Sequence, residues 1–150
     1  DSEGFPGIAS LFRAAARAEE IHAKNHLDVI HKFGKEAVAD IKAPEVKSTK
    51  ENLEAAIKGE TYEMNEMYPQ FLAAARKEKQ KDAIKTFNGA MEAEKEHAKL
   101  YAEALANMDK NKVGAIEFMV CPTCGYTLKK AKLEKCPVCF TPGEKFEIVK

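Results

Sequence analysis

The sequence lacks several features that would by themselves assign it to a broad class of proteins. It contains no tryptophan and only four cysteines, and its formal net charge is zero because 24 Lys and Arg residues balance 24 Asp and Glu residues. A balanced charge gives no general attraction to nucleic acid or to an anionic membrane, so we expect neither as a partner. There is no apolar run of membrane-spanning length and no signal peptide, which predicts a cytoplasmic protein.

What is present is typical of a globular protein. The 150 residues, 45% hydrophobic and 32% charged, suffice for one core and a small appendage. Apolar residues recur at helical spacing in three stretches, at about 7–33, 48–71 and 84–105. Ser48 and Glu51 form a capping box that starts the second stretch, and Pro69 predicts a kink or local break inside it.

The composition changes near residues 109–113. Beyond this point, 113–120 predicts a short strand, two cysteine-containing turns follow, and 146–149 predicts a closing strand. The predicted fold is therefore mainly α, with a helical domain at 1–110 and a small β domain at 113–150.

A repeated pattern, E-x-x-H-A-K, occurs in the helical part at 19–24 and again at 94–99. Its Glu and His are three residues apart, so they share one helical face, and in both copies they interrupt an apolar stripe. The second helix carries two further glutamates with the same spacing. Buried carboxylates repel one another unless cations neutralise them, and two divalent metals would neutralise four. The sequence thus predicts a di-metal site in a ferritin-like arrangement, with the candidate ligands Glu19, His22, Glu60, Glu63, Glu94 and His97.

Simpler explanations apply to single members of this set. One Glu-x-x-His in a helix is usually chance or a surface pair, and the repetition on apolar stripes is what favours metal binding. His26 has no zinc-protease context and is interpreted as a packing histidine near the site. Tyr62 and Tyr68 are candidates for hydrogen bonds to ligand carboxylates, and Tyr68 is the better placed, although a core tyrosine explains its spacing equally well.

Mixed Glu and His ligands favour iron or manganese with open positions, and hence redox chemistry with dioxygen or a peroxide.

The four cysteines form two C-P-x-C turns separated by eleven residues. Their clustering in a reducing compartment indicates metal ligation rather than disulfides. A tetrahedron of thiolates suits both structural zinc and a rubredoxin-type iron, and the ligands alone favour zinc. The predicted ligands are Cys121, Cys124, Cys136 and Cys139.

Together these motifs resemble the rubrerythrins over nearly the whole chain. The resemblance rests on both Glu-x-x-His motifs, on the segment G-E-T-Y-E-M-N-E-M-Y-P at 59–69, and on C-P-T-C-G-Y at 121–126. It implies a ferritin-like di-iron domain followed by a rubredoxin-like domain that holds one iron. It also implies a non-haem peroxidase that reduces hydrogen peroxide to water in defence against oxidative stress. The six Glu and His residues above would bind the two irons, Glu63 would exchange ligands between redox states, and Tyr68 would lie just outside the ligands.

The same resemblance implies partners. Electrons would come from NAD(P)H through an external rubredoxin or reductase and enter at the four-cysteine iron. The protein would be a homodimer or higher homo-oligomer, with the four-cysteine iron of one subunit close to the di-iron site of the other.

The main departure from the family pattern is that three helices are found where the family has four. The absent helix is the first, which carries a further Glu ligand. We expect it from a segment outside this sequence, from another polypeptide, or by swapping from a partner subunit. A lesser departure is Phe140, which stands where a Gly often follows the second cysteine turn.

Two other functions fit parts of the sequence. One is iron oxidation and sequestration by a ferritin-like protein with a structural zinc ribbon, although storage needs no electron inlet. The other is a zinc-ribbon interaction module on a purely structural bundle, which leaves the buried Glu and His residues unexplained.

Overall fold

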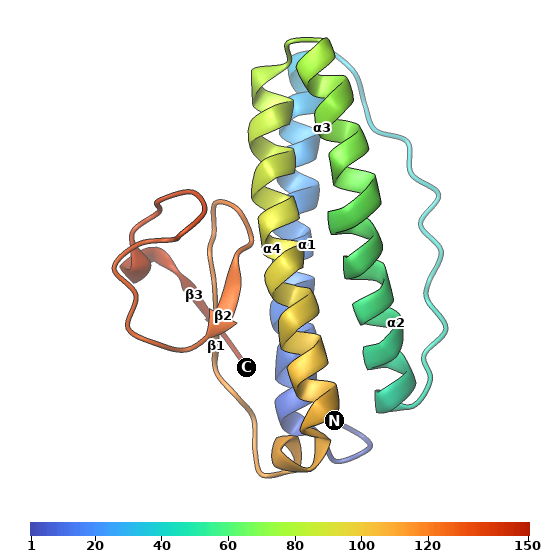
Figure 1. The fold of residues 1–150 in the computed structure, drawn as a ribbon, viewed down its shortest axis with the longest axis vertical. Coiled ribbons are helices and arrows are strands. Elements are labelled where there is room, and N and C mark those ends of the chain that lie inside the picture. The colour runs from blue at the N-terminus through green and yellow to red at the C-terminus, as the bar shows by residue number, and fades with distance from the viewer.

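The computed structural model describes all 150 residues as a long helical bundle with a small sheet attached to its side (Figure 1). The bundle contains helix α1 (Pro6–Lys32), helix α4 (Lys81–Ala106) and a third long helix built from α2 (Thr49–Tyr62), η1 (Glu63–Met67) and α3 (Tyr68–Lys77). These three are the helices predicted from the periodicity, and we refer to the third as the α2–α3 helix. No helix is long and apolar enough to cross a membrane.

The helix ends follow local sequence signals. Pro6 occupies the start of α1, where its missing N–H costs no hydrogen bond, and Gly34 follows the end of α1 at φ +65°, a conformation that glycine adopts without strain. The predicted capping box of α2 is confirmed: the Ser48 side chain accepts from the Glu51 N–H, and the Glu51 carboxylate accepts from the Ser48 N–H.

The irregularity predicted at Pro69 takes a different form from a break. The helix runs on through Glu63–Met67 with the wider π-helical turn, and the Tyr68 N–H bonds to the Glu63 carbonyl five residues back. Proline has no N–H and its ring crowds the carbonyl four residues earlier, so a wider turn just before it keeps the helix continuous. The π-turn begins at Glu63, one of the predicted metal ligands.

The helices leave one position of a four-helix bundle open. Helix α4 packs against both α1 and the α2–α3 helix, whereas α1 and α2 make few contacts with each other. The exposed connection 34–47 runs the length of the bundle, so α1 and α2 are parallel (Figure 1). A long crossover of this kind is the topology of ferritin-like bundles. The open position lies between α1 and the α2–α3 helix.

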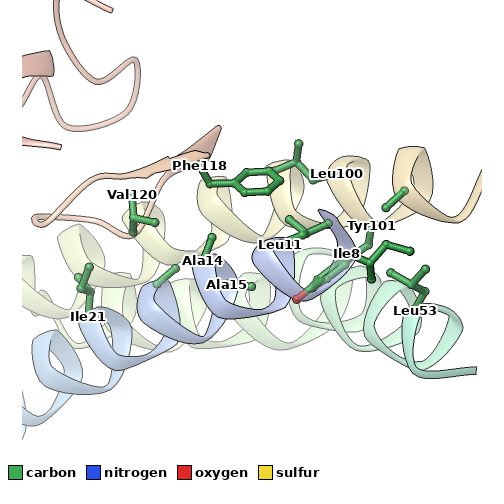
Figure 2. Close-up of a cluster of buried hydrophobic side chains, with 12 residues drawn as sticks. Ile8, Leu11, Ala14, Ala15, Ile21, Leu53, Leu100, Tyr101, Phe118 and Val120 are labelled. Atoms are coloured by element: carbon green, nitrogen blue, oxygen red, sulfur yellow. The ribbon is translucent and has the colours of Figure 1, made fainter. Parts of the chain in front are cut away.

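One core joins the bundle to the sheet. Its buried apolar residues come from α1, α2, α4 and strand β1 (Phe118–Val120), and β1 supplies Phe118 and Val120 (Figure 2). Each large apolar side chain buried in this way stabilises the fold by roughly 1.5–3 kcal/mol relative to exposure. The sheet is therefore packed firmly on the α1 and α4 side of the bundle.

The sheet has the strand order β2-β1-β3 and both pairings are antiparallel. Strand β2 spans Thr127–Lys129 and β3 spans Glu147–Val149, while short 3-10 turns occupy Met108–Lys112 and Gly143–Lys145. The predicted strand at 113–120 is shorter in the structure and starts only at Phe118. Val113 is 90% exposed and Gly114 follows it, so the start of that stretch has no partner to pair with.

Candidate metal centres

Carboxylates and an imidazole from three helices converge inside the bundle. Glu19 of α1, Glu60 of α2, and Glu94 and His97 of α4 each place one ligand atom within 4.8 Å of all the others. His22 adjoins this group, because its Nδ1 lies 3.0 Å from Glu94 Oε1 and 3.2 Å from Glu19 Oε2. We call these residues, together with Glu63, the Glu/His site.

Glu94 lies between the two imidazoles. Its Oε1 faces His22 Nδ1, and its Oε2 is 2.9 Å from His97 Nδ1. Both carboxylate oxygens and His97 Nδ1 are buried without a well-aligned hydrogen bond. Buried polar groups are nearly always partnered, so these orphaned atoms are what a site for cations requires. The donor set of carboxylates and imidazoles fits two iron ions.

The outer nitrogens of both imidazoles contact the small sheet domain. His22 Nε2 is 3.1 Å from the Cys124 carbonyl oxygen, which can only accept, so this nitrogen carries the proton. His97 Nε2 is 3.1 Å from Thr127 Oγ1, whose own proton is donated to the Gly125 carbonyl. His97 Nε2 therefore also donates. Both rings present Nδ1 to the carboxylates, the tautomer that a metal ligand needs.

The electrostatics of the site without metal show how strongly the groups interact. Burial disfavours a charged imidazole, but the neighbouring carboxylates outweigh it and raise the pKa of His22 to about 10 and that of His97 to about 9. Burial likewise opposes ionisation of Glu94, yet the two histidines lower its pKa to about 2. In the absence of metal the site neutralises itself with protons. Metal binding must displace these protons, so we expect it to weaken as the pH falls.

Glu63 lies at the margin of the Glu/His site, on the π-turn. It is half buried, and burial followed by repulsion from Glu94, Glu19 and Glu60 raises its pKa to about 7. The structure thus places Glu63 beside the cluster but outside the four groups that meet within 4.8 Å. A carboxylate on a wider helical turn is a suitable candidate for a ligand that moves.

The two tyrosine candidates differ in burial. Tyr62 is 52% exposed, whereas Tyr68 is 4% exposed. Burial, and then repulsion of a phenolate by Glu94, Glu63 and Glu19, raises the pKa of Tyr68 far above its usual range.

Two residues near the site were missed by sequence reasoning. Burial, and then repulsion of a phenolate by Glu60, Glu19 and Glu94, raises the pKa of Tyr101 far above its usual range. Its spacing of four residues from His97 was the available signal, but the same spacing also fits the apolar stretch at 84–105. Thr127 contacts His97 from the small sheet, and no signal in the sequence links these two residues.

The four cysteines form a second site. Cys121 Sγ and Cys139 Sγ are 3.4 Å apart, Cys124 Sγ and Cys136 Sγ are 3.6 Å apart, and no disulfide is formed. Metal–sulfur bonds of about 2.3 Å in a tetrahedron give a sulfur–sulfur distance of roughly 3.8 Å, so the site needs little adjustment to hold one ion.

The two sites adjoin one another within this single chain. Besides the bond from His22 to the Cys124 carbonyl, Gly125 approaches so closely that a Cβ atom on it would be 2.3 Å from His22 Nε2. The resemblance implied that the four-cysteine iron would approach the di-iron site of a partner subunit. In this chain the four-cysteine site lies against His22 of the same chain's Glu/His site.

Comparisons with known proteins agree with this geometry. Residues 1–105 match the family model described as Rubrerythrin. The chain is 39% identical to Rubrerythrin-2 of Clostridium acetobutylicum over 98% of its own length and 81% of that protein. It is 36% identical to nigerythrin of Nitratidesulfovibrio vulgaris, covering 96% of this chain and 71% of that one. A solved structure of fully reduced, all-ferrous nigerythrin superposes with a TM-score of 0.90 at 34% identity, covering 98% of this chain and 72% of that chain.

Proposed function

This chain belongs to the rubrerythrin family, and from that premise we propose that it is a non-haem di-iron peroxidase that reduces hydrogen peroxide to water. The observation that carries the proposal is the hydrogen bond between His22 and the Cys124 carbonyl. It joins a candidate ligand of the two-iron site directly to the backbone of a candidate ligand of the one-iron site. A protein that only stores iron has no use for such a connection.

We assign the ligands by donor chemistry. Glu19, His22, Glu60, Glu94 and His97 would hold the two irons, with Glu63 available to exchange as the redox state changes. Iron in such a site supplies two electrons for cleavage of the O–O bond. The chain's own contribution is to hold both imidazoles in the Nδ1-inward orientation, through the Cys124 carbonyl and the Thr127 hydroxyl.

The four-cysteine site would be the electron inlet. The path from Cys124 Sγ through its own carbonyl to His22 Nε2 crosses only one residue and one hydrogen bond of 3.1 Å. Short bonded paths of this kind favour one-electron transfer between the sites. We keep the proposed division into a di-iron domain at 1–110 and a one-iron domain at 113–150, because each set of candidate ligands lies wholly within one of these two ranges.

We expect a fourth helix in the open position between α1 and α2. Glu94 and His97 are fully buried, whereas Glu19, which borders the open position, has a side chain that is 49% exposed. A ligand carboxylate so accessible to water suits a site that is completed by another element, as the resemblance implies, and that element would carry a further carboxylate.

The wider setting follows from the same proposal. Electrons would originate from NAD(P)H and reach the four-cysteine iron through a separate rubredoxin-type carrier or reductase. The functional unit would be a homo-oligomer. Four unpaired thiols in one cluster suit the reducing cytoplasm.

A visible spectrum and a peroxide titration test the proposal together. The oxidised protein should be red from iron bound by four thiolates, and reduced protein should be reoxidised by hydrogen peroxide with one peroxide consumed per two electrons. Glu94→Ala and His97→Ala should abolish this reoxidation while the red colour stays. A colourless protein that contains only zinc would exclude the electron inlet. Unchanged turnover in both variants would exclude the ligand assignment.

A further inference from the structure

A short line of polar groups leads from the surface of the bundle to Tyr68. Thr86 Oγ1 of α4 is 3.1 Å from His26 Nδ1 of α1, and His26 Nε2 is 3.5 Å from the Tyr68 hydroxyl. Thr86 lines a groove of about 520 Å³ between the helices and the second cysteine turn, so water can reach the Thr86 end of this line of polar groups. Phe87 packs on the His26 ring with centroids 5.2 Å apart and holds it in place.

The single proton of a neutral imidazole couples the directions of these two hydrogen bonds. Burial lowers the pKa of His26 to about 4, helped by the nearby His22, so the ring is neutral and carries a single proton. If the Thr86 hydroxyl donates to Nδ1, the proton of the ring must sit on Nε2. Nε2 then donates to the Tyr68 oxygen, and Tyr68 keeps its own proton for another acceptor. The Glu94 carboxylate is the acceptor available to this proton: burial is the main cause of the raised pKa of Tyr68, and Glu94 raises it further by its charge and by a hydrogen bond from the phenol.

We propose that His26, oriented by Thr86, is a positioning residue for Tyr68: it occupies the lone pair of the tyrosine oxygen and directs the hydroxyl proton into the Glu/His site. This inference deepens the proposed function and rests on it for its consequence in catalysis. Reduction of one hydrogen peroxide to two waters consumes two protons and two electrons. A hydroxyl whose proton already points into the site is suited to donate a hydrogen bond to the peroxide as it is cleaved.

The alternative is that His26 simply fills space between two aromatic rings. Its ring centroid is 6.2 Å from that of Tyr68 and its side chain is half buried, so some packing role is certain. A packing role depends on shape and is indifferent to which nitrogen carries the proton. The positioning role requires the Nε2–H tautomer. The tautomer is therefore the observation that separates the two.

The first experiment reads the tautomer without any turnover. Long-range proton–nitrogen spectra of the full chain, labelled with nitrogen-15 histidine and loaded with diamagnetic zinc, report the protonated nitrogen of each ring, and the signals of His26 are identified by their loss in His26→Gln. We expect neutral His26 with the proton on Nε2, and a mixture of tautomers in Thr86→Val. A proton on Nδ1, or an unchanged tautomer in Thr86→Val, would overturn the proposal.

The second experiment measures reoxidation of the reduced protein at saturating peroxide. His26→Leu keeps the apolar packing and loses the donor, so the rate should fall roughly tenfold, the value of one lost hydrogen bond. His26→Gln retains a donor near the Nε2 position and should recover most of the rate. Thr61→Val is the matched control, because it removes a half-buried helical hydroxyl that bonds only to the Ile57 carbonyl, and it should leave the rate unchanged.

A double-mutant cycle then asks whether His26 acts through Tyr68. The effect of His26→Leu should vanish when Tyr68→Phe is already present, since no hydroxyl remains to be oriented. An equal loss of rate in both backgrounds would show that His26 acts by packing alone. If the wild-type protein has no peroxidase activity, the proposed function fails, but the tautomer of His26 in wild type and in Thr86→Val still decides the positioning role.

Discussion

The two cysteine turns have similar backbone conformations but different surroundings. In the first knuckle (121–126) the Gly125 N–H bonds to the Cys121 carbonyl at 2.9 Å, and in the second (136–141) the Phe140 N–H bonds to the Cys136 carbonyl at 3.1 Å. The residue after the second cysteine has positive φ in both, +75° at Gly125 and +63° at Phe140. The first knuckle lies against α1 and the second faces solvent.

The difference shows why position 125 of the first knuckle requires glycine. Positive φ favours glycine in both knuckles, but the second one tolerates a phenylalanine that is 67% exposed. At Gly125 a side chain has no room, because a Cβ would be 2.3 Å from His22 Nε2 and 3.2 Å from the Ala18 carbonyl oxygen. The backbone conformation alone therefore does not demand glycine. The close approach of the first knuckle to His22 is what requires glycine there.

The largest effect is expected from adding one methyl group to the first knuckle. Gly125→Ala should displace His22 or separate the small domain from α1, because overpacking and the positive φ together cost roughly 2–4 kcal/mol. Thermal unfolding of the iron-loaded protein should show Tm lowered by roughly 5–15 °C. Phe140→Ala, which places the same residue at the equivalent position of the second knuckle, is the control. A similar loss of Tm in both variants would contradict the comparison.

The next largest effect is expected at Thr127, directly after the first knuckle, whose hydroxyl accepts a hydrogen bond from His97. Thr127→Val keeps the shape but leaves the buried Nε2–H without its acceptor, which costs roughly 1–3 kcal/mol. Iron affinity of the Glu/His site should fall roughly 10–100-fold, and the red four-cysteine iron should remain. Chelator competition followed by iron counting measures both. Thr141→Val serves as the counterpart, since Thr141 contacts Cys139 Sγ at 3.1 Å and should alter only the four-cysteine spectrum.

A smaller effect of opposite sign is expected at Phe140. Phe140→Gly removes the strain of positive φ at a bulky residue, roughly 1–2 kcal/mol, against an entropy cost of roughly 0.5–1 kcal/mol for the glycine. The net change should be a stabilisation of about 0.5–1 kcal/mol, measured by thermal unfolding. Lower stability would mean that the exposed ring, with Lys135 Nζ 5.2 Å from its centroid, contributes more than its strain costs.

The smallest effect concerns the ion pair that ties the sheet to α1. Arg17 Nε donates to Glu147 Oε2 at 2.6 Å, and this bond lowers the pKa of Glu147 below its ordinary value of 4.5. Because the folded pKa is the lower one, the stabilisation is fully present above pH 4.5 and is lost as the pH falls through the folded pKa. Both side chains are more than a third exposed, so the loss is small.

Glu147→Gln provides the measurement of that pair. The variant should be slightly less stable than wild type to urea at pH 7, and the difference should shrink at pH 4. A difference that stays constant over this range would show that the carboxylate charge contributes nothing to the attachment of the sheet.

Much of the fold was predictable because it depends on local signals. The three helices follow from apolar periodicity, the start of α2 from its capping box, and the four-cysteine cluster from its spacing. The sequence did not predict that the irregularity at Pro69 would be a π-turn. Pro69 indicated a kink or break, whereas the wider turn before it keeps the helix continuous, so that α3 still packs against α4. The strand at 113–120 was predicted too long because apolar residues without a neighbouring strand do not pair.

By itself, the sequence determined which side chains are candidate metal ligands and which helix faces carry them, since residues three apart share one face of a helix. Only the tertiary structure decided which atoms of those side chains face one another. The Nδ1-inward orientation of His22 and His97 depends on acceptors more than 25 residues away in the sequence, at Cys124 and Thr127. Such contacts come from the packing of β1 on α1 and α4, a long-range result of burying apolar surface that no local pattern encodes.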